Sequence, residues 1–392
     1  MYVAYSDKQI ELQKELHDYF AKLIPPEVRD RIKGEGSHSE EARQIRRQMG
    51  ADGWLGVGWP KEYGGRSLSA LEQFIFYDEA QKAGAPLPFI ALNTVGPTLM
   101  RFGTDEQRQK YLPGILKGEL DFAIGYTEPN AGTDLASLQT RAVREGGEYI
   151  INGQKVFTSG GDVADYIWLA ARTDPEAKKH RGISIFIVPT DSPGFSTQPL
   201  YTMGGGHTTF SFYEDVHVSA ENLVLGENEG WKLITTQLNH ERVGLAANSG
   251  AIMRLVSEVI DWARETKTTT GERVIDQPWV QLSLARAHAV LDAVKLHNWR
   301  MAAALQADSL TPGDASASKV LGTEAAQEAA RILGEVVGQA GYLTAGSPGA
   351  ELAGRVEAAY RGAIVGGFGG GSNEVQREIV AWTELGMPRR AR

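Results

Sequence analysis

The chain has 392 residues, no cysteine and a formal net charge of −9 at pH 7. A single hydrophobic core stops growing below this length, so we expect two or three packed units. The missing cysteines exclude disulfides, thiolate nucleophiles and cysteine-ligated metals, and the acidic balance argues against a nucleic-acid partner.

The first part of the chain has the period of amphipathic helices. Apolar residues recur at helical spacing from Leu12 to Phe20 and from Phe74 to Ala80. We predict further helices at 97–102 and 105–116. The chain starts without a basic patch followed by an apolar stretch, and no stretch approaches the roughly 18 apolar residues of a membrane span, so we expect a cytoplasmic protein.

Short alternating runs replace the helical pattern between residues 121 and 230. Apolar and β-branched residues alternate in them between turns, which is typical of strands in an all-β unit. The runs cover residues 149–153, 166–170, 183–188 and 210–213. Asn152-Gly153 is a dipeptide typical of a hairpin turn, so we place a turn there.

Helical spacing returns after residue 231. It is clear from Leu255 to Ala263, and again in Leu282, Ala285, Ala289 and Leu296. The sequence therefore predicts a mainly α fold with a central β unit: an N-terminal helical domain (1–120), a barrel-like middle domain (121–230) and a C-terminal four-helix bundle (231–392). Ligands favour such domain junctions, so we expect a pocket where the β unit meets the bundle.

Two segments of the β unit carry many hydrogen-bonding groups. Tyr126-Thr127-Glu128-Pro129-Asn130-Ala131-Gly132-Thr133-Asp134 combines hydroxyls with exposed backbone amides, which suit a ring carbonyl or a phosphate oxygen. Lys155-Val156-Phe157-Thr158-Ser159 places an aromatic ring beside two hydroxyls, which suits the face and edge of a planar heterocycle. The simpler alternatives are a surface turn for the first segment and a core strand for the second.

Together with Gly371-Ser372-Asn373-Glu374-Val375-Gln376-Arg377 near the end, these segments resemble the flavoprotein acyl-CoA dehydrogenases, over nearly the whole chain. The resemblance implies FAD as cofactor and oxidation of an acyl-CoA thioester to its trans-2-enoyl product. It implies no metal. The residues that it assigns to FAD are Tyr126, Thr127, Thr133, Phe157, Thr158, Ser159, Ser372, Asn373 and Glu374. The family usually has tryptophan at Phe157, and the aromatic ring is kept here.

The same resemblance implies which carboxylate takes the substrate proton. In the medium-chain type the base lies near the C-terminus, where this chain has Gly370, and glycine has no titratable group. In the isovaleryl and long-chain types it lies early in the C-terminal bundle, at the position of Glu241. The alternative for Glu241 is a solvated carboxylate beside Arg242.

Other residues would then contact the acyl-CoA substrate. These substrate-binding residues would be Asn239, His240, Arg242, Gly370 and Gly371. Arg242 would anchor an anionic or carbonyl group and hold Glu241 in place. The backbone amide of Gly370 would donate to the thioester oxygen and stabilise the developing enolate.

Two segments depart from the family pattern. In homotetrameric members, the neighbouring subunit completes each flavin site through an arginine-containing segment and a Gln-x-x-Gly-Gly-x-Gly-like segment. Here they align with residues 268–273 and 335–341, where a threonine lies near the arginine position and Glu335 replaces a neutral donor. We therefore expect a homologous second subunit in an α2β2 assembly, as in actinobacterial steroid side-chain acyl-CoA dehydrogenases, although drift within a homo-oligomer is the alternative.

Four functions remain open at this point. The first is dehydrogenation of a bulky, steroid-type acyl-CoA, with an electron-transfer flavoprotein as the electron acceptor. The second is an acyl-CoA oxidase, in which oxygen reoxidises the flavin. A homotetrameric branched- or medium-chain dehydrogenase and a non-catalytic assembly subunit are further alternatives, and Glu241 argues against the last one.

Overall fold

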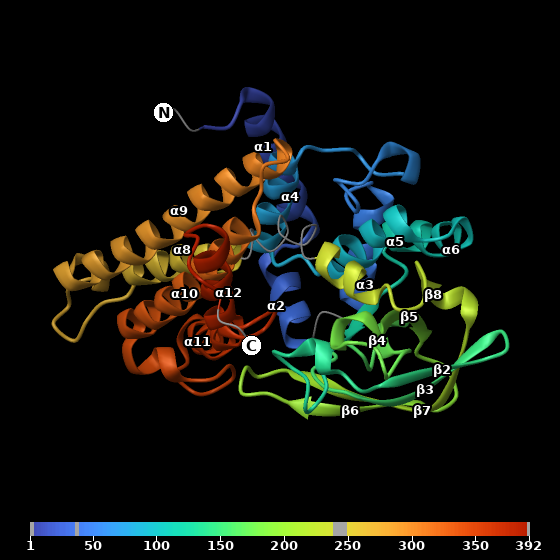
Figure 1. The fold of residues 1–392 in the computed structure, drawn as a ribbon. Helices are drawn as coiled ribbons and strands as arrows, with labels where there is room; N and C mark the ends of the chain where they lie inside the picture. The colour runs from blue at the N-terminus through green and yellow to red at the C-terminus, as the bar shows by residue number, and fades with distance from the viewer. Residues whose placement is uncertain (1–3, 36–38, 238–248, 390–392) are drawn as a thin grey trace.

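The computed structural model describes residues 4–35, 39–237 and 249–389, and helices flank a central sheet as predicted (Figure 1). The N-terminal part is helical. Its helices are α1 (Asp7–Leu23), α2 (Pro26–Glu35), α3 (Glu40–Ala51), α4 (Ala70–Ala83), α5 (Gly96–Phe102) and α6 (Asp105–Leu116), with a π-helical turn at Ala91–Val95 before α5. The predicted helices at 97–102 and 105–116 are confirmed.

Side-chain caps fix where these helices begin. Ser69 accepts a hydrogen bond from the Glu72 backbone, and the Glu72 carboxylate accepts one from the Ser69 backbone at 2.8 Å. This reciprocal cap satisfies two backbone donors at the start of α4. Thr104 and Gln107 form the same arrangement on α6. The Gln107 amide also donates to backbone carbonyls of Glu221 and Leu223, so α6 is attached to the end of the sheet.

The middle part is one sheet in the order β6-β7-β3-β2-β4-β5-β8, with β1 parallel to β4. The predicted strand runs are confirmed. The strands are β1 (Phe122–Gly125), β2 (Arg141–Glu145), β3 (Glu148–Lys155), β4 (Tyr166–Arg172), β5 (Ile183–Pro189), β6 (Phe195–Tyr201), β7 (His207–Ser219) and β8 (Leu223–Val224).

The predicted hairpin turn at Asn152-Gly153 is wrong. Glu145 pairs with Glu148, so the turn between β2 and β3 lies at residues 146–147, and Asn152-Gly153 lies inside β3. The register with β7 shifts at this point, and the Asn152 amide donates to the Asp215 carboxylate at 2.9 Å. A side chain at 153 would approach Thr140 within 2.7 Å, so close packing against that residue explains the glycine.

Strands β4 and β5 are buried on both faces. Ile167 and Leu169 of β4 pack into a core inside the β unit, while Trp168 and Ala170 face the core that the sheet shares with the N-terminal helices. Strand side chains alternate between two faces, so each strand supplies both cores. This two-sided burial explains why their sequences are almost continuously apolar.

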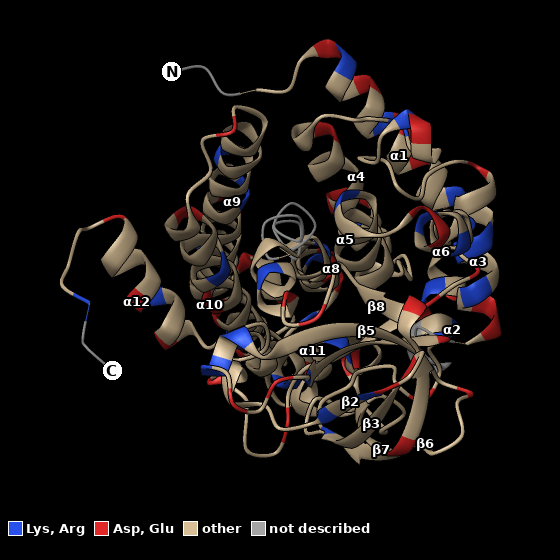
Figure 2. Cartoon of the chain, turned by 45° about the vertical axis from the view of Figure 1, so that its right-hand side comes forward, with Lys and Arg blue, Asp and Glu red and all other residues tan. Residues whose placement is uncertain are grey.

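The C-terminal part is a helical bundle. Residues 230–237 are helical where the chain leaves the sheet. The further helices are α8 (Gly250–Glu265), α9 (Pro278–Gln306), α10 (Pro312–Val337), α11 (Arg355–Ala363) and α12 (Asn373–Thr383). Apolar residues of α8 to α11 share one core, and Figure 2 shows α12 beside α10, on the opposite side from helices α1 and α3.

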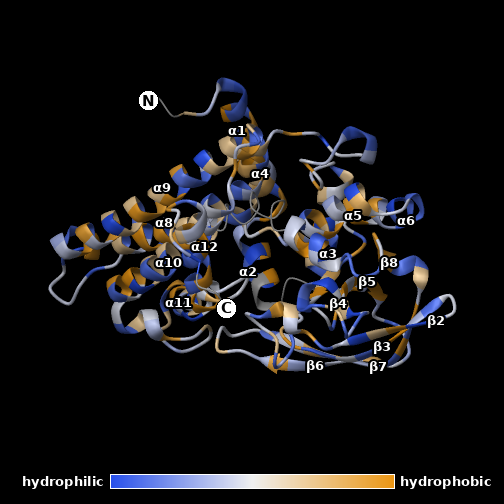
Figure 3. Ribbon diagram, viewed as in Figure 1, coloured by the Kyte–Doolittle hydropathy of each residue, from blue (hydrophilic) through white to orange (hydrophobic). Residues whose placement is uncertain are grey.

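Helix α9 has two apolar stripes. The helix is confirmed, but its buried side is formed by Val280, Leu284, Ala287 and Leu291. The set from which we predicted it, Leu282, Ala285, Ala289 and Leu296, is exposed; Leu282 is 73% and Leu296 54% exposed. Figure 3 shows apolar residues recurring along the length of α9. The bundle alone leaves the second stripe uncovered.

Candidate functional site

The structure brings the two predicted cofactor segments together. Tyr126 and Thr127 follow β1, and Phe157 to Ser159 follow β3. The Val156 backbone N–H donates to the Thr127 carbonyl at 2.9 Å, and Lys155 Nζ donates to the Tyr126 carbonyl at 3.1 Å. Two segments about thirty residues apart in sequence therefore form one surface.

Phe157 presents its ring outward from this surface. Its side chain is 58% exposed and its backbone has φ +59°, a region that bulky residues rarely adopt because of a steric penalty of about 1–3 kcal/mol. Thr158 and Thr209 hold this backbone through two hydrogen bonds, from Thr158 N to Thr209 O at 3.0 Å and from Thr209 Oγ1 to Thr158 O at 2.7 Å. The strained residue leaves an aromatic face uncovered beside Thr127.

The two hydroxyls after Phe157 have different positions. Thr158 is buried, and its hydroxyl forms a hydrogen bond of 3.0 Å with Ser211. Ser159 is exposed, with its hydroxyl 3.1 Å from that of Thr208. Ser159 can therefore reach a bound ligand directly, while the side chain of Thr158 is used inside the sheet.

A buried ion pair fixes the connection that carries Tyr126 and Thr127. The Lys155 ammonium is fully buried and lies 2.8 Å from the Glu128 carboxylate. That carboxylate also accepts hydrogen bonds from the backbone amides of Gln139 and Thr140, each at 2.7 Å. Glu128 thus fixes this connection near its start, through Lys155, and near its end, through the amides of Gln139 and Thr140. Neither charged residue was among the predicted site residues, although both lie in the two segments that were predicted to bind the cofactor.

The pKa values of Lys155 and Glu128 are both lowered, but by different causes. Burial lowers the pKa of Lys155 to about 8, although the Glu128 carboxylate acts to raise it. Burial raises the pKa of Glu128, but the Lys155 charge and the hydrogen bonds from Lys155 and Thr140 outweigh burial, so the pKa stays below its ordinary value. Both groups are therefore charged at pH 7.

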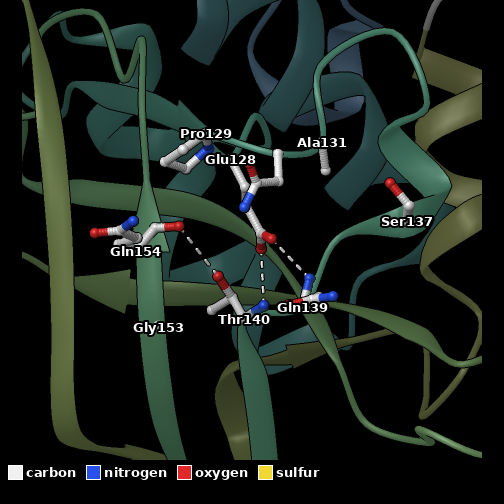
Figure 4. Close-up of a pocket in the computed structure, with 9 residues that line it drawn as sticks. Glu128, Pro129, Ala131, Ser137, Gln139, Thr140, Gly153 and Gln154 are labelled. Carbon is white, nitrogen blue, oxygen red and sulfur yellow. Dashed lines mark hydrogen bonds between the residues drawn. The ribbon is translucent and has the colours of Figure 1, made fainter.

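A cavity of about 430 Å³ lies beside this ion pair (Figure 4). Its lining residues are Glu128, Pro129, Asn130, Ala131, Ser137, Gln139, Thr140, Gly153 and Gln154. Figure 4 shows the Glu128 carboxylate turned toward the Gln139 and Thr140 amides. None of the predicted cofactor residues lines this cavity. Thr133 is an exposed residue of the same connection.

A chain of three hydrogen-bonding side chains runs from Trp168 through Tyr126 to Gln237. The Trp168 indole N–H donates to the Tyr126 hydroxyl at 3.0 Å, and that hydroxyl donates to Gln237 Oε1 at 2.6 Å. Gln237 is only 2% exposed, and within the described part of the chain its Nε2 has no hydrogen-bond partner. No local sequence signal pointed to Gln237.

The predicted C-terminal residues lie at the start of α12. The Ser372 hydroxyl caps this helix by accepting from the Val375 backbone N–H. Asn373 is buried, and its amide bonds to Lys319, Thr323 and Glu324 of α10. Asn373 therefore serves the packing of α12 on α10 in this chain.

The other predicted residues near α12 are exposed to solvent. Glu374, Gly370 and Gly371 are exposed, with φ +68° and +96° at the two glycines. The predicted base Glu241 and its predicted neighbours Asn239, His240 and Arg242 lie outside the described residues.

Among the described residues, no helix is both long and apolar enough to cross a membrane. In the same part of the chain, no cluster of three or more His, Asp or Glu side chains could hold a metal ion.

Comparison with known proteins gives the same domain order. Residues 6–119 match the family model of the acyl-CoA dehydrogenase N-terminal domain, 123–214 that of the middle domain and 228–384 that of the C-terminal domain. Acyl-CoA dehydrogenase FadE26 from Mycobacterium tuberculosis is 52% identical over 398 residues, covering 99% of both chains.

Two similar solved structures are both complete matches in length. One is described as Tcur3481-Tcur3483 steroid ACAD, with 53% identity and a TM-score of 0.94, and covers 100% of both chains. The other is the ChsE4-ChsE5 complex from Mycobacterium tuberculosis, with 52% identity, a TM-score of 0.92 and the same coverage. This chain belongs to the acyl-CoA dehydrogenase family of oxidoreductases.

Proposed function

We propose that this chain binds FAD and removes two hydrogens from a bulky acyl-CoA thioester, with Glu241 as the base. The observation that carries the proposal is the single surface on which Tyr126 and Thr127 lie beside Phe157, joined by the 2.9 Å hydrogen bond from Val156 to Thr127. An aromatic face and a row of hydroxyl and amide donors suit a flat heterocycle with polar edges.

The described residues fit a flavin. The uncovered ring of Phe157 can shield one face, and the Thr127 and Ser159 hydroxyls can bond an edge. The buried Gln237 Nε2, which has no partner in residues 4–35, 39–237 and 249–389, adds a donor beside Tyr126. In this proposal Tyr126, Thr127, Phe157 and Ser159 hold the flavin directly, and Thr158 contributes by fixing the backbone.

When bound, FAD supplies a two-electron acceptor for the hydrogen at the substrate β-carbon. The protein supplies the base. An ordinary glutamate has a pKa of about 4.3 and is weak toward a thioester α-proton, so exclusion of water by the substrate must raise the pKa of Glu241. Backbone donation from Gly370 to the thioester oxygen would stabilise the developing enolate, and Arg242 would hold the carboxylate in place.

Glu241→Gln tests the base. We expect the variant to keep its flavin and bind thioester, but to lose turnover by several orders of magnitude, because glutamine cannot take a proton. Glu258→Gln on α8 is a matched control, since Glu258 is already paired with Arg355 at 2.8 Å. Near-normal turnover in Glu241→Gln would remove Glu241 from this role.

We also propose that a homologous second subunit completes the assembly. In this chain Arg273 is paired with Asp276 at 2.7 Å, and Glu335 is paired with Arg331, so neither segment offers a free cation to a neighbour's flavin. The exposed stripe of α9 provides an apolar surface for a partner helix. The name of the ChsE4-ChsE5 relative describes a complex of two chains.

Expression alone and together with a co-encoded homologue tests the assembly. We expect the chain alone to bind flavin poorly and the pair to form a 2:2 complex with one flavin for every two chains, measured by light scattering and absorbance. A stable tetramer of this chain alone with one flavin per chain would contradict the proposal.

For the substrate we propose a steroid-type acyl group, because one relative is described as a steroid ACAD. The reduction of bound flavin by a series of acyl-CoA thioesters measures this preference directly, with straight-chain thioesters as the control. We propose an electron-transfer flavoprotein as the electron acceptor. Oxygen consumption with peroxide formation at the turnover rate would indicate an oxidase instead.

A further inference from the structure

Gln237 is the last described residue of the helical segment 230–237, and the hydrogen bonding of its buried amide is unusual. It is 2% exposed, yet Nε2 has no hydrogen-bond partner among the residues that the structure describes. A buried amide group without a partner costs about 1–3 kcal/mol. Native proteins pair nearly all such groups, so an unpaired one calls for an explanation.

Two neighbouring side chains form a chain of hydrogen bonds with the Gln237 amide. The Trp168 indole nitrogen can only donate, so at 3.0 Å it occupies a lone pair of the Tyr126 oxygen. The Tyr126 hydroxyl donates its proton to Gln237 Oε1 at 2.6 Å. With Oε1 facing Tyr126, the two N–H donors of Nε2 face away from it.

This chain of donors lies where three parts of the molecule meet. Trp168 and Tyr126 pack in the core between the sheet and the N-terminal helices. Leu233 and Ile234, on the same helical segment as Gln237, pack in that core too. In sequence, Gln237 precedes the proposed base Glu241 by four residues. A junction of this kind is a common place for a ligand.

We propose that Gln237 Nε2 donates a hydrogen bond to a carbonyl-type oxygen of the ligand at this junction, and that Trp168 and Tyr126 orient it for that contact. The inference rests on the proposed function and adds to it a residue for ligand recognition. Two ligands carry such an oxygen, namely the flavin ring and the acyl-CoA substrate. Since only N–H groups remain on Gln237, the group it recognises must be an acceptor.

Gln237→Glu is the most selective variant. Glutamate keeps an oxygen to accept from Tyr126, but it replaces both N–H donors by an oxygen that repels an acceptor when ionised. We expect ligand binding to weaken roughly tenfold or more, as for loss of one buried hydrogen bond. Binding should recover partly at low pH, where the protonated acid can donate again. A residue with only a packing role would not give this pH dependence.

Two further variants keep the test independent of the behaviour of a buried carboxylate. Gln237→Met removes the donors without adding charge, and Tyr126→Phe removes the proton that orients the amide. Thr235→Ala on the same segment is the matched control, because the Thr235 hydroxyl is exposed and bonds only carbonyls of its own helical turn. Circular dichroism and thermal unfolding check that each variant is folded.

The measurements separate the two ligands. A shifted flavin absorption band and weaker FAD binding in Gln237→Met would assign the contact to the flavin. An unchanged flavin spectrum with a raised dissociation constant for acyl-CoA would assign it to the substrate. If folded Gln237→Met and Gln237→Glu match the Thr235→Ala control in both measurements, the inference is overturned, and the Nε2 group is satisfied by water alone.

This failure differs from a failure of the proposed function. If the wild-type complex takes up no flavin and oxidises no thioester, the proposed function itself is wrong. If the wild type does both, and the Gln237 variants bind flavin and acyl-CoA as well as the control does, the proposed function stands without this contact.

Discussion

Replacing Glu128 by glutamine tests how the buried Lys155 charge is maintained. In the folded protein the pKa of Lys155 is about 8, against an ordinary 10.5. Because the folded value is the lower one, the contribution of this group to stability rises with pH between about 8 and 10.5. Without the Glu128 carboxylate, the anion that raises the pKa of Lys155 is gone, and burial still lowers it. We expect the pKa of Lys155 to fall below 7, so that the variant folds with a neutral amine.

The expected loss has two parts. At pH 7 the wild type gains about 1 kcal/mol from protonating folded Lys155, whose pKa of about 8 lies above this pH, and the variant does not. At pH 9 the amine is neutral in both, so this part vanishes. Glutamine also has one oxygen for the two backbone donors of Gln139 and Thr140, and an unpaired buried N–H costs about 1–3 kcal/mol. We expect a deficit of about 2–4 kcal/mol at pH 7, smaller by about 1 kcal/mol at pH 9.

Urea unfolding followed by tryptophan fluorescence measures this deficit at both pH values. Protein and flavin concentrations are held fixed, because binding shifts apparent stability. Asp134→Asn is the control, since the exposed Asp134–Lys179 pair at 2.5 Å should contribute no more than about 1 kcal/mol at either pH. In a Lys155→Met background, Glu128→Gln should lose its pH dependence. A deficit that stays constant or grows from pH 7 to pH 9 would refute the reasoning.

Three further substitutions have definite expected outcomes. Gly96→Ala should destabilise the protein by about 1–3 kcal/mol, because the added methyl would overlap the buried Trp59 ring; thermal unfolding measures it. Gly322→Ala inside α10 should stabilise by about 0.5–1 kcal/mol, because the methyl reaches only Val294 at 3.9 Å, and an equal or lower unfolding temperature would contradict this. Leu282→Glu should leave this chain's helicity unchanged but weaken the proposed complex, since Leu282 is exposed on α9; unchanged sedimentation of the pair would argue against that surface.

Periodicity predicted the elements better than it predicted their partners. The apolar runs of β4 and β5 were recognisable because both faces are buried. The Asn152-Gly153 dipeptide misled because its turn preference is overridden by the Asn152–Asp215 hydrogen bonds, a contact between residues 63 positions apart. On α9, helical spacing identified the helix but could not tell the buried stripe from the exposed one, since both are apolar.

The site was predictable only in part. Composition singled out the segments of Tyr126 and Phe157, but their adjacency depends on a backbone hydrogen bond between distant residues. Lys155 and Gln237 had no local signal, because burial and pairing are properties of the fold. The roles of Glu241 and the cofactor residues stay predictions, as do the divisions at residues 120 and 230.

Because side chains of β4 alternate between two cores, the sheet depends on the helices that cover it. Trp168 and Ala170, with Ile185 and Ile187 of β5, form a wall against the N-terminal helices. A fragment that holds only the sheet would expose these residues to water as a continuous apolar surface, and such surfaces promote aggregation. Anyone transplanting the sheet between related enzymes should therefore move the helices that cover it as well.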